Sequence, residues 1–365
     1  MYAIRHQVNI KYSSGKMKIC AILSIIFLPL INCYNLSADN INCVLFRTYI
    51  DYRIIQASKP EQILAQDIFN PLRKTVMFIP GDETTLDNPN VRPLLESYIN
   101  SKQYNVIHMD AYKYTSENAP GLMGEILHWL GDLYASILST LIKLGLRVDD
   151  IQLVGHSYGA SIAYLVAKQT TPKLPLLVGL DPVFYDYFQK GYADYTIVLH
   201  SNIGQIGTHF YNSADSNLIA NDGTIQPKCT DRNVFEIESD EELAKVIRCS
   251  HVAAAGYWAG MIENPELFFG VQCNATDCNY AYIVQLGPNL RKPGQFYFKT
   301  SKNAPYGLGL DGVKNITPIN TDLLKVYHYN LFQDRLDEAK MLQANYISDI
   351  YNYEHHIHLN NFNKK

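Results

Sequence analysis

The sequence predicts an α/β fold in which a mostly parallel central sheet is covered by helices on both faces. Short apolar runs alternate along the chain with helix-like segments, which is typical of parallel sheets because a helix must return the chain to the same edge. The apolar runs lie near residues 74–80, 104–110, 150–155, 175–181 and 195–201. The segment from Leu122 to Leu144 has the apolar spacing of a long amphipathic helix.

A nucleophile elbow is predicted at Gly155-His156-Ser157-Tyr158-Gly159, which joins the third apolar run to an alanine-rich helical run. In such an elbow the serine lies on a strained turn at the carboxyl end of a strand, and the glycines leave room beside it. The helix that begins after Ser157 directs its positive end toward a developing oxyanion. We therefore predict an α/β-hydrolase fold with Ser157 as the nucleophile. A surface turn is the alternative for a pattern with only three fixed letters.

Asp181 is the predicted acid of the site. A serine hydroxyl needs a base to take its proton, and the base needs an acid to hold its orientation. In the hydrolase fold the acid follows the serine along the chain, and the histidine follows the acid. Asp181 ends the apolar run 174–180, on the same edge of the sheet as Ser157. The alternative is an ordinary turn or cap residue ahead of Pro182.

His251 is the predicted base. It follows Cys249 by two residues and precedes the helix-compatible run 253–261, so a loop anchored by a disulfide would hold its imidazole steadily. The other candidates are His200, which also suits a hydrogen-bonded core position, His209, His328 and a cluster at 355–358 in the polar tail.

These residues belong to a longer series of motifs that resembles the animal lipase family, which contains pancreatic lipase, the sn-1 phospholipases of insects and the catalytically inert yolk proteins of flies. The resemblance covers roughly residues 44–310 in consistent order. The matching segments are Thr75–Asp82, Asn105–Asp110, the elbow, Gly179–Pro182, Ile197–Ser201, Gln226–Cys229, Cys249–His251, Phe296–Thr300 and Pro305–Gly307. The resemblance implies a triad of Ser157, Asp181 and His251, the same residues that the chemical argument selects.

The resemblance also implies two backbone amides as oxyanion donors, those of Tyr158 and of Asp82. A carboxylate at residue 82 would oppose developing negative charge unless it turns outward to water. Other departures from the family pattern lie nearby: Ala111 replaces a tryptophan, Ser161 a histidine and Ala253 an arginine. The triad is therefore whole, while its surroundings differ.

The segment 230–248, between Cys229 and Cys249, mixes apolar with acidic residues. Such a loop suits a lid that covers the site in water and turns its apolar side toward a lipid surface, and a plain surface helix or loop is the equal alternative. By resemblance, disulfides join Cys229 to Cys249 and Cys273 to Cys278, and Cys43 is left either free or joined to Cys33. By the same resemblance, Tyr192 stands where the family often has a calcium-binding aspartate, so we expect no structural calcium. We also expect no other metal and no cofactor.

Composition and the amino-terminal segment predict a secreted protein. A net charge of −4, without a block rich in Lys and Arg, argues against nucleic acid as a partner. The basic start at Lys16–Lys18 and the apolar run Ile19–Ile31 fit a secretory signal, which we assign to residues 1–38. The lipase domain is expected at 39–310, followed by a partly helical or disordered extension at 311–365. The segments Asn274-Ala275-Thr276 and Asn315-Ile316-Thr317 match the glycan-acceptor pattern.

Together these features predict a secreted serine ester hydrolase that acts on glycerolipids, as a lipase or phospholipase A1, through an acyl-enzyme intermediate. The alternative is a lipid-binding or storage protein of the yolk-protein type that has kept the fold and lost turnover. The intact Ser157, Asp181 and His251 favour the enzyme, whereas Asp82 and Ala253 favour the alternative.

Overall fold

The computed structural model describes residues 7–318, apart from 14–15, 26–27, 82–85, 87, 90, 116–122, 184–187, 208–213, 233–236, 238 and 275. The chain divides into two units, Met1–Pro318 and Ile319–Lys365, and all described residues lie in the first. The predicted helix within Thr321–Ile350 therefore falls outside the described residues. Within the part of the chain that is described, no helix is long and apolar enough to cross a membrane.

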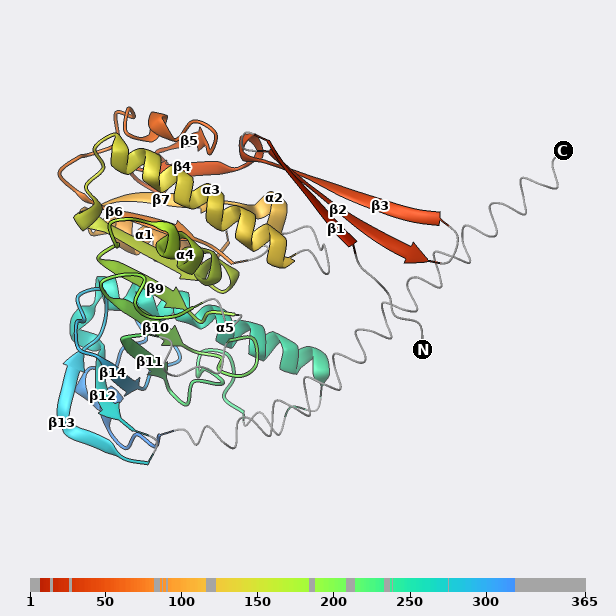
Figure 1. Ribbon diagram of the computed structural model, residues 1–365. Helices are drawn as coiled ribbons and strands as arrows, with labels where there is room; N and C mark the ends of the chain where they lie inside the picture. Colours follow the sequence, from red (N-terminus) through yellow and green to blue (C-terminus); the bar gives the residue numbers. More distant parts are fainter. Residues whose placement is uncertain are drawn as a thin grey trace. The chain divides into compact units, whose positions relative to one another are not determined.

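An eleven-stranded sheet forms the centre of the first unit (Figure 1). Its strand order is β13-β12-β14-β11-β10-β9-β8-β6-β7-β4-β5. The strands from β14 to β7 are paired in parallel, and two antiparallel strands border them on each side. The bounds are β4 (Asn42–Phe46), β5 (Tyr52–Gln56), β6 (Lys74–Ile79), β7 (Tyr104–Asp110), β8 (Ile151–His156), β9 (Leu176–Leu180), β10 (Thr196–His200), β11 (Ser216–Ala220), β12 (Phe269–Cys273), β13 (Cys278–Gln285) and β14 (Gly294–Phe298).

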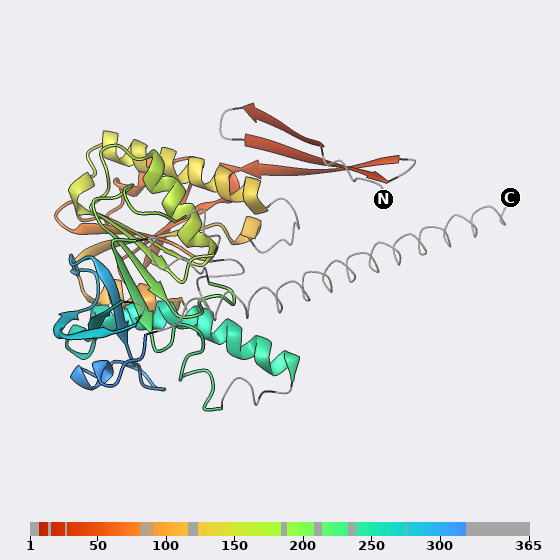
Figure 2. The same cartoon turned by 60° about the horizontal axis from the view of Figure 1, so that its bottom comes forward.

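Helices cover both faces of this sheet, as Figures 1 and 2 show from two directions. On one face α3 (Met123–Lys143) packs on α4 (Tyr158–Gln169), and on the other α1 (Arg92–Asn100) packs on α5 (Asp240–Glu263). Each layer buries its own apolar core against the strands, which is the main favourable term in folding. The shorter helices are α2 (Tyr112–Thr115) and the 3₁₀ turns Ala38–Asn40, Pro60–Ile63, Val148–Asp150, Pro265–Leu267 and Leu310–Val313.

The predicted α/β-hydrolase fold is confirmed. The five predicted strands are β6, β7, β8, β9 and β10, the predicted long helix is α3, and all their bounds agree to within one residue. These strands are buried on both faces and therefore read as continuous apolar runs. The edge strands β5 and β13 were not predicted, and most of their positions are exposed or half-buried, unlike those of the central strands.

Residues 7–37 form a second sheet of three antiparallel strands, β1 (Gln7–Ser13), β2 (Lys16–Ile25) and β3 (Leu28–Ser37). The described residues of the apolar run Ile19–Ile31, on which the predicted secretory signal rests, belong to β2 and β3. Its assignment as a signal stays a prediction, as do the domain bounds at 39–310 and 311–365.

Candidate active site

Ser157 occupies the turn between β8 and α4. Its backbone φ of 57° and ψ of −125° lie in a region that side-chain-bearing residues rarely adopt, as in a nucleophile elbow. A Cβ on Gly155 would overlap the backbone of Gly159, and a Cβ on Gly159 would overlap the carbonyl of Ile79. Both positions therefore require glycine, which lets the turn pack closely against β6 with Ser157 at the carboxyl end of β8.

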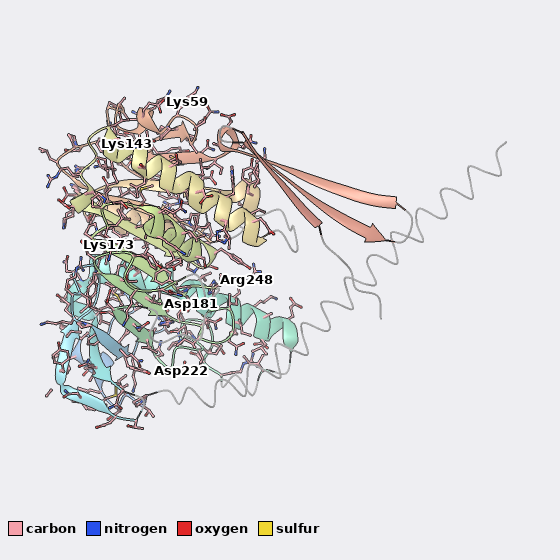
Figure 3. All side chains as sticks on the ribbon, viewed as in Figure 1. Lys59, Lys143, Lys173, Asp181, Asp222 and Arg248 are labelled. Atoms are coloured by element: carbon pink, nitrogen blue, oxygen red, sulfur yellow. A yellow bond between two sulfur atoms is a disulfide. The ribbon has the colours of Figure 1, made fainter. Side chains whose placement is uncertain are left out.

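Asp181 directly follows β9, the strand beside β8, and is fully buried (Figure 3). Its Oδ1 accepts hydrogen bonds from the backbone N–H groups of Ser201, at 2.9 Å, and of Asn202, at 3.0 Å. Both donors follow the end of β10, the next strand of the sheet. Two backbone amides on one oxygen stabilise a carboxylate and fix the plane of the side chain, so that Oδ2 points in one direction.

His251 lies in that direction. Its Nδ1 is 2.6 Å from Asp181 Oδ2, and 5% of the residue is exposed. Nε2, on the opposite side of the ring, has no hydrogen-bond partner among the residues described. The hydrogen bond between Ser157 Oγ and His251 Nε2 is therefore not formed in this structure. In free enzymes this catalytic hydrogen bond is often long, and it shortens when substrate binds.

The prediction that His251 lies in a loop before a helix is wrong. Helix α5 begins at Asp240, so His251 lies well inside it. The helix begins early because Ser239 caps it, with the Ser239 hydroxyl accepting a hydrogen bond from the N–H of Glu242. The imidazole is therefore held by helical backbone as well as by the disulfide at Cys249.

A second buried histidine, His156, packs against His251. The two ring centroids are 4.9 Å apart, and His156 Nε2 donates a hydrogen bond to the backbone carbonyl of His251 at 3.4 Å. Burial, followed by the neighbouring His251, lowers the pKa of His156 to about 3, so this ring is neutral at neutral pH. His156 stands in the elbow pentapeptide directly before Ser157, so this contact brings His251 to the elbow. Sequence reasoning gave His156 no role, although it lies within the most informative motif.

Gln226 is a further residue that sequence reasoning missed. It is fully buried; its Nε2 donates to the carbonyl of Ser201 at 2.7 Å, and its backbone N–H donates to the hydroxyl of Ser250 at 3.0 Å. Ser201 holds Asp181 and Ser250 precedes His251, so one residue supports both members of the pair, the acid through its side chain and the base through its backbone. In the sequence, the motif Gln226–Cys229 contributes only to the family resemblance.

Of the two predicted oxyanion donors, Tyr158 lies within the described residues and Asp82 does not. Tyr158 is the first residue of α4, where backbone N–H groups point outward from the helix and carry partial positive charge. Asp82 lies outside the described residues. The residue before it, Gly81, lies against the nucleophile, since a Cβ there would be 2.9 Å from Ser157 Cβ. The loop after β6 therefore passes beside Ser157.

The segment 230–248 includes the first turns of α5. The apolar side chains of Ile237, Val246 and Ile247 are buried. The charged residues Lys245 and Arg248 are exposed. Residues 233–236 and 238 lie outside the described part of the chain. The amphipathic composition noted in the sequence is thus arranged with apolar side chains inward, and the prediction of a lid stays a prediction.

Both disulfides implied by the resemblance are present, Cys229–Cys249 and Cys273–Cys278. Cys43 is a free and buried thiol, and burial raises its pKa to about 12. Across the described residues, no group of three or more His, Cys, Asp or Glu side chains could hold a metal ion.

The departures from the family pattern lie in the protein interior. Ala111, Ser161 and Ala253 are all buried. The Ser161 hydroxyl donates a hydrogen bond to the carbonyl of Val183 at 2.8 Å. Ala253, on α5, packs in the apolar core that α1 and α5 form with the sheet. Small side chains at these positions are therefore accommodated by packing.

The mostly parallel sheet and the strand–serine–helix elbow define the protein as an α/β hydrolase. The sequence profile of the family described as Lipase matches residues 40–281, and the chain belongs to this family.

Similarity to individual proteins is low. Pancreatic lipase-related protein 2 of Myocastor coypus is 23% identical over 248 residues, which are 61% of this chain and 51% of that protein. Phospholipase A1 of Vespa crabro is 25% identical over 198 residues, 48% of this chain and 62% of that protein. The chain thus spans about half to two thirds of the length of these relatives. Among solved structures, MGS-M1, an α/β hydrolase from a Medee basin deep-sea metagenome, is 15% identical to this chain. The match covers 53% of this chain and 68% of the MGS-M1 chain, with a TM-score of 0.26.

Proposed function

We propose that this protein is a secreted serine ester hydrolase that cleaves glycerolipids. The observation that carries the proposal is the 2.6 Å contact between Asp181 Oδ2 and His251 Nδ1, buried next to an elbow that bears the strained Ser157. An imidazole held in this way has its Nδ1 proton fixed by the carboxylate and its Nε2 lone pair available, which is what a general base for a serine requires.

In the proposed reaction, Ser157 Oγ attacks the ester carbonyl while His251 Nε2 takes the hydroxyl proton. The imidazolium, stabilised by the buried Asp181 carboxylate, then gives that proton to the leaving alcohol. The backbone amides of Tyr158 and Asp82 would hold the oxyanion. Water activated by the same imidazole hydrolyses the acyl enzyme and restores the serine.

The class of substrate is proposed from the family. Relatives named as a pancreatic lipase-related protein and as a phospholipase A1 support a glycerolipid ester, either a triacylglycerol or a phospholipid. We propose segment 230–248 as a lid whose buried Ile237, Val246 and Ile247 would turn toward a lipid surface. The two disulfides support secretion, because such bonds persist in oxidising compartments.

A fluorophosphonate probe tests the proposal directly, because it labels only an activated serine. We expect labelling of the purified protein, its loss in Ser157→Ala and its retention in Ser136→Ala, which removes an exposed hydroxyl on α3. Hydrolysis of phosphatidylcholine, phosphatidylserine and galactolipid vesicles and of a triolein emulsion by the same three proteins would then identify the substrate class.

Hydrolysis that survives Ser157→Ala would remove the mechanism. A folded wild-type protein that binds lipid vesicles but is neither labelled nor active would instead be the lipid-binding or storage protein.

A further inference from the structure

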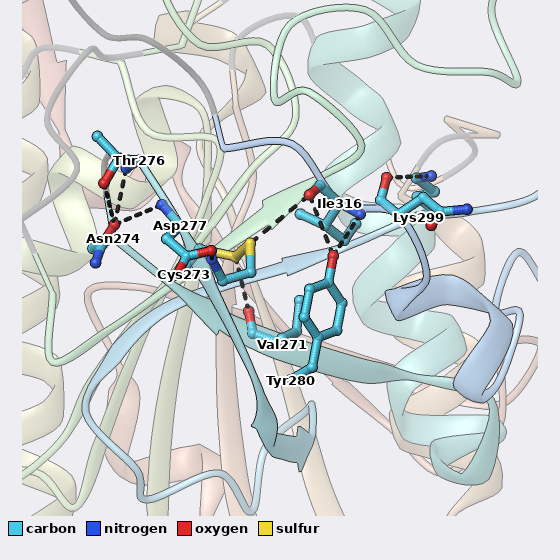
Figure 4. Close-up of a disulfide and its surroundings, with 10 residues drawn as sticks. Val271, Cys273, Asn274, Thr276, Asp277, Tyr280, Lys299 and Ile316 are labelled. Atoms are coloured by element: carbon cyan, nitrogen blue, oxygen red, sulfur yellow. Dashed lines mark hydrogen bonds between the residues drawn. A yellow bond between two sulfur atoms is a disulfide. The ribbon is translucent and has the colours of Figure 1, made fainter.

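We infer that Asn274 is an N-glycan acceptor. Asn274 and Thr276 are the first and third residues of an Asn-x-Thr sequence, and both lie in the short loop that connects β12 to β13 inside the disulfide Cys273–Cys278 (Figure 4). The inference goes beyond the proposed catalysis and rests only on entry of the chain into the secretory pathway.

The loop presents the acceptor to solvent. Asn274, Thr276 and Asp277 are exposed, whereas the flanking cysteines are buried with 6% and 9% of their surface accessible. An oligosaccharide attached here therefore extends into water and displaces no packed side chain. The same sequence pattern in a buried strand could not carry a sugar in the folded protein.

The hydrogen bonds of the loop use the oxygen of the Asn274 amide. Oδ1 accepts from the backbone N–H of Thr276 at 2.9 Å, from the Thr276 hydroxyl at 3.2 Å and from the backbone N–H of Asp277 at 2.8 Å (Figure 4). Nδ2 makes no hydrogen bond to the described residues. A bond formed at Nδ2 therefore removes none of the contacts that shape the turn.

The modification is a group transfer from a lipid-linked oligosaccharide diphosphate, catalysed by a transferase of the secretory pathway. The new bond joins Nδ2 of Asn274 to C1 of the first sugar, and the C1–O bond to the diphosphate breaks. The lipid diphosphate leaves with the bonding electrons, and one Nδ2 proton passes to a base on the transferase. No oxidant or reductant takes part.

The position of Asn274 separates a glycan from the proposed catalytic centre. β13 is at one edge of the sheet, and β12, β14, β11 and β10 lie between it and β9, which Asp181 follows. At about 4.8 Å per strand this is about 24 Å across the sheet. Activity should therefore be the same with and without the sugar.

The sugar would instead stand beside an exposed sheet edge. In β13, Tyr280 is 48% exposed and Ile283 is 37% exposed, and an edge strand with exposed apolar side chains is prone to pair with another copy. A bulky hydrophilic group at the start of this strand would hinder that pairing.

The test expresses the full chain in a cell-free system with microsomes and reads the peptide that contains Asn274 by mass spectrometry. After peptide-N-glycosidase in ¹⁸O-water, a glycosylated Asn274 appears as ¹⁸O-labelled aspartate. We expect this label in the wild type and in Thr276→Ser, which keeps the hydroxyl, and its loss in Asn274→Gln and Thr276→Ala. Asn315→Gln, which removes the acceptor asparagine of the second Asn-x-Thr sequence, is the matched control and should leave the Asn274 peptide labelled.

Added protease separates the two ways in which the inference fails. Chains that are protected by the microsomes but carry an unmodified Asn274 overturn the glycan site and leave secretion standing. Chains that the protease digests have not been translocated, which overturns both secretion and the modification. Fluorophosphonate labelling of the translocated protein, equal in wild type and Asn274→Gln, shows independently whether the serine is active.

Discussion

The substitution Asp181→Asn tests the site most sharply, because the structure fixes how the new amide must lie. Two backbone N–H groups, those of Ser201 and Asn202, point at Oδ1 and require an oxygen there. The NH₂ group of the asparagine must then face His251 Nδ1, where it donates a hydrogen bond. The imidazole proton moves to Nε2, and the base has no lone pair to offer Ser157.

The expected loss is large. An asparagine that forces the wrong tautomer lowers kcat by about 10⁴-fold in serine proteases of the triad type, which corresponds to about 5 kcal/mol of transition-state stabilisation. We expect a loss of this order in kcat for a soluble ester and in the rate of fluorophosphonate labelling. KM should change little, since Asp181 is fully buried and does not line the surface that substrate meets.

The matched control is Asp149→Asn, which changes an exposed aspartate in the 3₁₀ turn before β8 and should leave kcat unchanged. Both variants should show wild-type circular dichroism before their rates are compared. A well-folded Asp181→Asn protein that keeps more than about a tenth of the wild-type kcat would refute the assignment, because a correctly oriented base loses far more than that when its tautomer is inverted.

Three further predictions concern stability. Gly159→Ala should destabilise the protein by about 3 kcal/mol or more in urea titrations, because the new Cβ overlaps a backbone carbonyl, whereas Gly124→Ala, with nothing within 4 Å, should be neutral or stabilising by up to about 1 kcal/mol. Equal effects of the two changes would contradict the packing argument. Replacing both Cys229 and Cys249 by serine should cost about 3 kcal/mol of unfolding free energy, since their disulfide closes a loop with a sequence separation of 20; an unchanged urea midpoint would show that the bond constrains nothing. Burial lowers the pKa of His108 to about 3, below its unfolded value near 6.5, so the unfolded chain binds the extra proton and stability is lost as pH falls from about 6.5 toward 3. His108→Leu should flatten this loss by about 2 kcal/mol between pH 6.5 and 5 in urea titrations at each pH, and an unaltered slope would exclude His108 as its source.

The centre of the fold could be predicted from the sequence because its strands are buried on both faces. β6 to β10 carry the apolar runs that periodicity detects, and α3 has a clear amphipathic pattern. The edge strands were not assigned: β5 has only five residues, and the run 280–284 of β13 is exposed or half-buried, unlike the buried runs of the central strands. Their place depends on pairing between distant segments, which no local pattern encodes.

The proposed site was predictable as a set of residue types and an order along the chain. The contact between Asp181 and His251 joins residues 70 positions apart, and only the chemical need for an acid and a base linked them in advance. The supports were hidden: Ser201 and Asn202 act through backbone amides, which any residue possesses. The sequence does not reveal that His251 lies inside a helix, because the cysteine at 249 suggests a loop. The residue that caps this helix, Ser239, lies ten residues before Cys249.

The early start of α5 limits where segment 230–248, the proposed lid, could pivot. The same helix carries the end of this segment and, a few residues later, the imidazole, and between them Cys249 is tied back to Cys229. If segment 230–248 is the lid proposed above, a swing that uncovers Ser157 would be absorbed ahead of residue 249, by bending or unwinding of the first turns of α5, while the ring at 251 keeps its place. Under that proposal, access to the site and the proposed chemistry would vary independently, although one continuous helix bears both.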